Sequence, residues 1–171
     1  MINIASIIHN DGINGPGLRC TVFVQGCKRK CVGCHSQHTW EFGTGVDYSA
    51  DDLIDECRKN PLDTGITFTG GDPIYQYKEL LPVVNKLRQK YNLWLYTGAT
   101  IDELKYKSRH DTDLHEFLKA FNCIVAEPFI LEKRDVTLKY RGSTNQRMYR
   151  IYTDSVGIDY FKDITSTIER M

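Results

Sequence analysis

The chain has 171 residues, of which 41% are hydrophobic and 26% are charged, enough for one domain with a sizeable core. Its 22 basic and 22 acidic residues cancel, which argues against the basic surface of a nucleic-acid-binding protein. The first residues do not have a signal-peptide pattern, so we expect none, and the sequence contains no linker, no repeat and no apolar run near the ~20 residues of a membrane span. We therefore expect a single domain over residues 1–171, located in the cytoplasm, that binds neither nucleic acid nor membrane.

Segments rich in Ile, Val, Phe and Thr predict six strands. In chain order these strands are residues 2–8, 18–25, 65–69, 93–97, 123–126 and 149–153. Turn-forming residues fill positions 10–17, between the first two strands. The third strand runs directly into Gly-Gly-Asp-Pro.

Helical spacing of apolar residues predicts five helices among these strands. The first helix begins after Ser49, and the other four cover about residues 76–91, 101–106, 113–121 and 158–170. Ser49 is expected as an N-cap, with Asp52 in a capping-box-like position. Pro82 is expected to delay or kink the second helix.

The alternation of strands and helices predicts an α/β fold with right-handed crossovers. A complete eight-fold barrel typically needs ~250 residues. We therefore expect an open, partial (β/α) barrel of about six mostly parallel strands with flanking helices. The active site of such a sheet lies at the carboxyl ends of its strands.

Three cysteines follow the second predicted strand within eight residues: Cys27, Cys31 and Cys34. Soft sulfur ligands favour iron–sulfur clusters, zinc or Cu(I). Three cysteines would leave one iron of a four-iron cluster free to bind a small molecule. Zinc is the alternative, because His35 would complete a Cys3His set, but adjacent residues rarely both ligate one ion without strain. The spacing favours a cluster, and Cys20, Cys57 and Cys123 are interpreted as buried thiols.

The second motif is Gly70-Gly71-Asp72-Pro73, after the third predicted strand. The glycines permit positive φ and close approach of the backbone to a ligand. Asp72 supplies a carboxylate and Pro73 stiffens the exit. Alone, the motif could be only a strand-to-helix turn. Because both motifs follow strands, we expect them to face one another at one edge of the sheet and to line an exposed groove.

Together, these two motifs resemble those of the radical S-adenosylmethionine enzymes. Within that superfamily, the chain is similar to the activating enzymes of anaerobic ribonucleoside-triphosphate reductase. The similarity covers most of the chain, and Arg-Gly-Ser-Thr-Asn-Gln-Arg at 141–147 narrows it to this family. The other matching stretches are residues 15–19, 23–27, 33–35, 39–40, 69–73 and 96–98.

The resemblance implies that Cys27, Cys31 and Cys34 ligate a 4Fe–4S cluster whose open iron chelates the methionine part of S-adenosylmethionine. Its reductive cleavage would give a deoxyadenosyl radical, which takes hydrogen from a glycine on the large reductase subunit. The implied partners are that subunit and a reduced, flavodoxin-like electron donor. The residues expected to bind the cofactor are Gly33, His35, Gly70, Gly71, Asp72, Pro73 and Thr97.

The chain departs from the superfamily pattern at two places. Gly33 stands where many members have an aromatic residue against adenine, a contact that His35 or another ring could take. Ala126-Glu127-Pro128-Phe129 replaces an Asp-Gly pair before Phe, so the role of that Asp is absent or moved to Glu127.

The roles of several charged residues stay open. Residues 28–30 (Lys-Arg-Lys) are interpreted as a solvated charge run or as a docking site for an acidic electron donor. Arg141, Arg147 and Arg150 could contact the partner subunit or S-adenosylmethionine. Two alternative functions remain: a radical S-adenosylmethionine enzyme acting on a small molecule, and a non-catalytic zinc-binding module.

Overall fold

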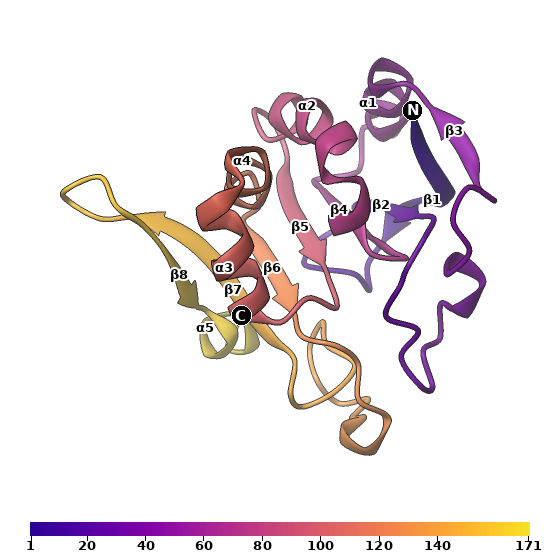
Figure 1. Ribbon diagram of the computed structural model, residues 1–171. Helices are drawn as coiled ribbons and strands as arrows, with labels where there is room; N and C mark the ends of the chain where they lie inside the picture. The colour runs from indigo at the N-terminus through magenta and orange to yellow at the C-terminus, as the bar shows by residue number, and fades with distance from the viewer.

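The computed structural model describes residues 1–171 and contains one open sheet of eight strands in the order β3-β1-β2-β4-β5-β6-β7-β8 (Figure 1). The edge strands β3 and β8 lie at opposite ends of this order. The bounds are β1 Ile2–Asp11, β2 Arg19–Val24, β3 Val46–Tyr48, β4 Gly65–Gly70, β5 Asn92–Tyr96, β6 Cys123–Ala126, β7 Arg147–Thr153 and β8 Asp159–Asp163.

Only the centre of the sheet is parallel. Strands β2, β4, β5 and β6 pair with one another in parallel. The outer pairs β3–β1, β1–β2, β6–β7 and β7–β8 are antiparallel. The α/β class and the open sheet are confirmed. The predicted number of about six strands is wrong, and a mostly parallel sheet is not confirmed, because three strand pairs are parallel and four are antiparallel. Crossovers through helices produce parallel neighbours only in the centre, whereas turns and loops without helical crossovers join the outer strands.

The two unpredicted strands have identifiable causes. β3 has three residues, none of them buried, and so shows no apolar pattern. β8 occupies the first half of the region where a helix was expected, residues 158–170. The predicted helix is wrong for that half. There, Asp154 N–H donates to the Ile158 carbonyl at 2.9 Å, and Gly157 takes φ +86°, so the chain turns back onto β7. Only α5, Thr165–Glu169, is helical.

The other predicted helices are present: α1 Ala50–Arg58, α2 Tyr77–Leu87, α3 Ile101–His110 and α4 Thr112–Lys119. Ser49 is the N-cap of α1, and its hydroxyl accepts the Asp52 N–H at 3.1 Å. Helix α2 continues through Pro82, so that residue does not delay it. Short 3-10 turns occupy η1 Gln37–Thr39, η2 Pro73–Gln76 and η3 Leu131–Lys133. No helix is both long and apolar enough to cross a membrane.

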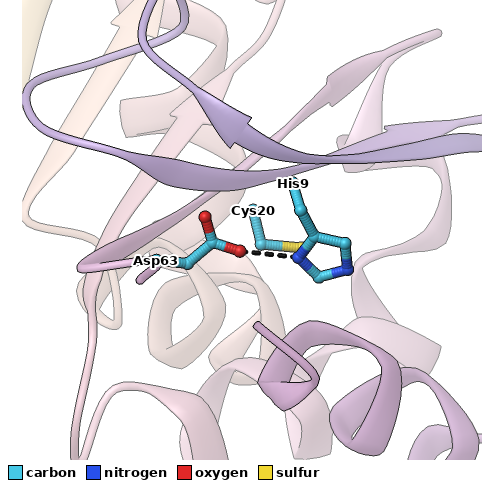
Figure 2. Close-up of side chains that lie close together, drawn as sticks. All are labelled: His9, Cys20 and Asp63. Atoms are coloured by element: carbon cyan, nitrogen blue, oxygen red, sulfur yellow. Dashed lines mark hydrogen bonds and ion pairs between the residues drawn. The ribbon is translucent and has the colours of Figure 1, made fainter. Parts of the chain in front are cut away.

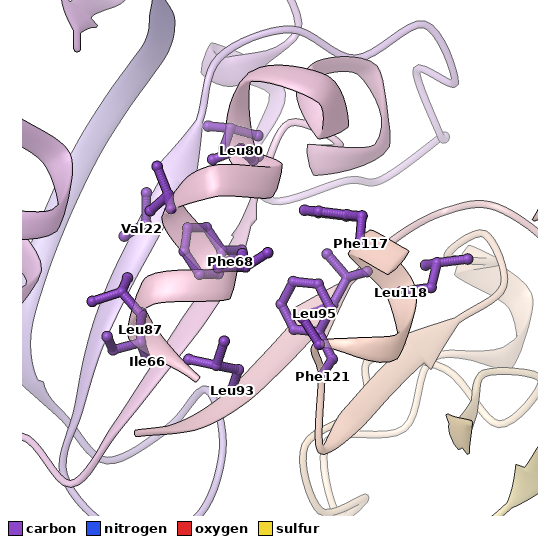
Figure 3. Packing of buried hydrophobic residues seen from close by; sticks show 14 of the residues in the cluster. Val22, Ile66, Phe68, Leu80, Leu87, Leu93, Leu95, Phe117, Leu118 and Phe121 are labelled. Carbon is purple, nitrogen blue, oxygen red and sulfur yellow. The ribbon is translucent and has the colours of Figure 1, made fainter. Parts of the chain in front are cut away.

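The main core lies between one face of the sheet and helices α1 to α4 (Figure 3). It contains 28 buried residues, with Phe68, Phe117 and Phe121 in edge-to-face contacts at its centre. A smaller cluster on the other face includes Trp94, against which the buried Arg19 guanidinium lies at 5.6 Å. Packing on both faces of the sheet holds the central strands in place, and with them the positions from which the loops at their carboxyl ends begin.

The β7–β8 hairpin is tied to α4 through Asp159. Its carboxylate accepts a hydrogen bond from Lys119 Nζ at 2.7 Å and lies 2.9 Å from His115 Nε2. The hydrogen bonds from Lys119, Thr153 and His115 hold the pKa of Asp159 well below its usual value. The carboxylate therefore stabilises the fold when it is ionised.

We expect Asp159→Asn to lower the free energy of unfolding by about 1 kcal/mol at pH 7. The folded-state pKa is depressed, so this contribution is present above the unfolded-state pKa of about 3.9 and is lost as the pH falls below it. Urea unfolding at pH 7 and pH 3 should show the difference from the parent protein shrinking in acid. The exposed Asp55→Asn serves as the control, and an equal loss at both pH values would contradict the prediction.

Candidate metal centre at the carboxyl ends of the central strands

The cysteine loop is closed at its base by backbone and side-chain hydrogen bonds. Gly26 N–H donates to the Thr39 carbonyl at 2.7 Å, and Cys27 N–H donates to the Trp40 carbonyl at 3.0 Å. The Gln25 side chain donates to the Glu41 carbonyl at 2.7 Å. Gly26 has φ +103°, which turns the chain out of β2. These contacts fix the loop without using any cysteine sulfur.

Cys27, Cys31 and Cys34 are all free and partly exposed on this loop. Cys34 N–H donates to the Cys31 carbonyl at 3.1 Å, and Ser36 N–H donates to the Cys34 sulfur at 3.4 Å. Burial is the main cause that raises the pKa of Cys27. By contrast, Cys20, Cys57 and Cys123 are buried, as the sequence predicts.

In the metal-free structure, the sulfurs of the triad are not as close together as zinc ligands would be. Zinc with sulfur ligands at about 2.3 Å in a tetrahedron requires sulfurs about 3.8 Å apart. The three loop sulfurs do not form a group within 4.8 Å of one another. A four-iron cluster binds each cysteine at a different iron and tolerates more widely spaced sulfurs. The donor set and its partial exposure therefore fit an iron–sulfur cluster.

The Gly-Gly-Asp-Pro turn lies directly against the base of the cysteine loop. Asp72 N–H donates to the Gly26 carbonyl at 2.9 Å, and Gly71 N–H donates to the Val24 carbonyl at 2.8 Å. A Cβ on Gly71 would lie 2.4 Å from the Gly26 carbonyl oxygen, so only glycine permits this approach. The prediction that the two motifs face one another is confirmed.

The Asp72 carboxylate is buried and has internal partners. One oxygen accepts the Thr97 hydroxyl at 3.0 Å and the Gly98 N–H at 3.1 Å, and the other accepts the Ile74 N–H at 3.2 Å. Desolvation raises its pKa. Asp72 therefore joins the end of β4 to the end of β5, and it also caps η2, in which Pro73 is the first residue and is buried.

Arg29 is a site residue that the sequence reasoning did not single out. Its Nη2 donates to Glu103 Oε2 at 2.6 Å, and its Nε lies 3.8 Å from Asp72 Oδ2. Burial opposes its charge, but the hydrogen bond to Glu103 and the nearby carboxylates outweigh this and raise the pKa of Arg29. The side chain thus links the cysteine loop to α3 and to the Asp72 turn, while Lys28 and Lys30 are exposed.

Leu131 lies beside Gly33. Gly33 is the position at which the resemblance would lead us to expect an aromatic residue. A Cβ on Gly33 would lie 2.8 Å from the Leu131 side chain, so the segment that follows β6 reaches the cysteine loop. Both loops extend from the same end of the sheet (Figure 1). His35 is exposed, and no aromatic contact is present at it.

The Arg-Gly-Ser-Thr-Asn-Gln-Arg stretch holds the segment after β6 in place. The Gln146 side chain accepts the Gly142 N–H at 2.8 Å and donates to the Glu127 carbonyl at 3.2 Å. Asn145 donates to the Pro128 carbonyl at 2.8 Å. Glu127 has φ +86°, and its carboxylate accepts the Ile101 N–H at 2.9 Å, at the start of α3.

The three arginines considered as partner contacts are engaged within the chain. Arg141 pairs with Glu169 and donates to the Gln146 carbonyl. Arg147 pairs with Asp163 at 3.0 Å. Arg150 lies 5.2 Å from the centre of the Tyr152 ring.

We expect Gly71→Ala to separate the two loops, because its Cβ would overlap a backbone oxygen that cannot move alone. The expected loss is about 1–3 kcal/mol in the free energy of unfolding, together with lower iron content after reconstitution. Urea unfolding and iron analysis measure the two effects. Gly12→Ala, where a Cβ meets nothing within 4 Å, is the matched control. Equal behaviour of the two variants would contradict the close loop contact.

We expect Asp72→Ala to destabilise the cluster-free protein, because it leaves the Thr97 hydroxyl and buried backbone N–H groups unpartnered. The expected loss is about 2–4 kcal/mol, and Asp72→Asn, which keeps one carbonyl acceptor, should lose less. Urea unfolding of the cluster-free proteins measures this. A fully stable Asp72→Ala protein would show that the carboxylate does not support the fold.

Comparison with known proteins agrees with this geometry. Residues 13–149 match the family described as a 4Fe-4S single cluster domain. The chain is 35% identical over 160 residues to the anaerobic ribonucleoside-triphosphate reductase-activating protein of Haemophilus influenzae, covering 87% of this chain and 98% of the relative. The proteins of that name from Escherichia coli K12 and Enterobacteria phage T4 are 31% and 32% identical, covering 82% and 86% of this chain and 94% of each relative.

Among solved structures, the chain has a weak similarity to QueE from Escherichia coli. The TM-score is 0.46 and the identity is 21%, over 58% of this chain and 53% of that chain. The family match and the sequence relatives each extend over most of the chain. This chain therefore belongs to the family of anaerobic ribonucleoside-triphosphate reductase-activating proteins.

Proposed function

We propose that this protein activates an anaerobic ribonucleoside-triphosphate reductase by generating a glycyl radical on its large subunit. The observation that carries the proposal is the direct backbone contact between the three-cysteine loop and Gly71-Asp72. This contact brings the loop that carries the three proposed sulfur ligands next to the glycine turn that is the proposed contact for a small ligand. The names of the relatives supply the reductase as the partner.

In this proposal, Cys27, Cys31 and Cys34 hold a 4Fe–4S cluster. When bound, the cluster supplies one electron for cleavage of S-adenosylmethionine to methionine and a deoxyadenosyl radical, which takes a hydrogen atom from the glycine. The task of the chain is positioning, because reacting atoms must approach to about 3–3.5 Å.

The glycine turn would hold the methionine part of S-adenosylmethionine. Backbone groups of Gly70 and Gly71 are the proposed contacts for its ammonium. Asp72 adds negative charge from behind the turn and, through Thr97 and Pro73, fixes the turn's position. Gly33 and His35 are the proposed neighbours of the adenosine part, with Leu131 packed beside Gly33.

The surroundings of the loop suit two protein partners. The three cysteines are partly exposed, so a loop of the reductase can approach them from solvent. Lys28 and Lys30 are exposed on the same loop and provide positive charge for a flavodoxin-like donor with an acidic surface. Arg29 is occupied by Glu103 and Asp72 and is therefore not part of this donor surface.

We expect alanine at Cys27, Cys31 or Cys34 to abolish cluster assembly and activation, because each position supplies one of three protein ligands. Cys123→Ala removes a thiol that is buried in the smaller cluster with Trp94, so this variant should retain both cluster assembly and activation. Iron and acid-labile sulfide are measured after anaerobic reconstitution. Retention of the full cluster by the Cys31→Ala protein would contradict the ligand assignment.

The reaction is tested by electron paramagnetic resonance of the reconstituted protein with reductase, S-adenosylmethionine and a reductant. A glycyl doublet that depends on all four components is expected. Cleavage of S-adenosylmethionine without a doublet would favour an enzyme acting on a small molecule. Zinc in place of iron and sulfide would favour the non-catalytic module.

A further inference from the structure

A second group of metal-ligating side chains lies at the opposite end of β2 from the cysteine loop. The potential ligand atoms of His9 on β1, Cys20 on β2 and Asp63 before β4 all lie within 4.8 Å of one another (Figure 2). His9 Nδ1 is 2.6 Å from Asp63 Oδ2. Cys20 is fully buried, and Asp63 is 4% exposed. No other part of the chain gathers three such atoms so closely.

Helix α1 adds an outer carboxylate. The Glu56 carboxylate lies 3.9 Å from Nε2 of His9. Cys57, on the same helix, is fully buried, but its sulfur is not part of the group of atoms within 4.8 Å. The grouped donors are therefore one thiol, one imidazole and one carboxylate, all of them ligand types that zinc takes.

The imidazole of His9 is incompletely satisfied by the protein alone. If Nδ1 carries the proton for Asp63, the lone pair of Nε2 faces Glu56, and Nε2 is buried with no hydrogen-bond partner. A cation on Nδ1 would move the proton to Nε2, where it points at Glu56. A ligating histidine commonly donates its other N–H to a carboxylate in this way. Both ring nitrogens of His9 then have a partner, the cation at Nδ1 and the Glu56 carboxylate at Nε2.

The outer contacts of the other groups also suit a bound cation. The second oxygen of Asp63 accepts the Asn10 N–H at 2.9 Å, which orients the carboxylate while leaving Oδ2 directed at the group. Lys59 contacts Glu56 at 2.5 Å and offsets its charge. The side chains of His9 and Glu56 are 23% and 24% exposed, so the outer edge of the group is in contact with solvent.

We propose that His9, Cys20 and Asp63 form a structural site for a divalent borderline metal, Zn²⁺, separate from the cluster. Binding requires loss of the Cys20 thiol proton and small inward shifts of the three side chains. The site would fasten β1, β2 and the segment before β4 to one another. This group lies at the start of β2, whereas Cys27 follows its end, so the two sites can be emptied independently.

The test uses the full chain carrying Cys27→Ala, Cys31→Ala and Cys34→Ala, in which the cluster ligands are absent. After exposure to Zn²⁺ under anaerobic conditions and removal of unbound ion, we expect about one equivalent of zinc per chain by elemental analysis. Co²⁺ in place of zinc should give thiolate-to-cobalt absorption, and a chelator should lower the melting temperature of the zinc-loaded protein.

Two further variants in this background assign the ligands. His9→Gln changes a partly exposed side chain and should reduce zinc affinity at least tenfold without unfolding the protein. Cys20→Ser should abolish the cobalt–thiolate absorption. His110→Gln and Cys123→Ser are the matched controls and should bind as the background does.

Two results would overturn the proposal, and the first needs no variant at the site. Absence of zinc and of cobalt–thiolate absorption in a folded sample would show that His9 is only a hydrogen-bonded link between Asp63 and Glu56. Zinc that is retained equally by the His9→Gln and His110→Gln proteins would place the metal elsewhere. Neither result would affect the cluster assignment, because the cluster ligands are absent from all these proteins.

Discussion

The candidate site depends on one backbone contact, between the residues that follow β2 and those that follow β4. The parallel register of these strands aligns Val24 with Gly70, and the hydrogen bonds of Gly71 and Asp72 extend the pairing beyond the sheet. No side chain intervenes there, since a Cβ on Gly71 would collide with Gly26. The positions of the cysteine loop and the glycine turn are consequently set by backbone geometry, which varies far less than side-chain packing.

A charged network reinforces this contact from the neighbouring strand. Asp72 is buried, a costly position for a carboxylate, and three hydrogen bonds together with Arg29 offset part of that cost, although desolvation still raises its pKa. Arg29 in turn pairs with Glu103 at the start of α3. The network therefore connects the cysteine loop, the ends of β4 and β5, and one helix. Asp72 is the buried end of this network, and the Glu103 side chain, 40% exposed, is its solvated end.

The sequence predicted the parts of this protein that depend on local patterns. Four central strands, four helices, the Ser49 cap and the juxtaposition of the two motifs follow from apolar periodicity, capping chemistry and strand order. β3 and β8 were not predicted, because a three-residue exposed strand and a polar hairpin have no apolar period. The contacts of Asp72 with Thr97 and Gly98 could not be predicted either, since these partners lie far along the chain. Arg29 was hidden within a run of basic residues that otherwise faces solvent, and only the fold shows which of the three turns inward.

The base of the cysteine loop has a consequence for the lifetime of the protein in a cell exposed to oxygen. Its hydrogen bonds involve Gly26, Cys27 and Gln25 but no sulfur atom, and the core of 28 residues lies behind the sheet, away from the loop. Loss of a cluster bound there would thus leave a scaffold that keeps its shape and its three cysteines. The same polypeptide could then be loaded with iron and sulfide again, without being resynthesised.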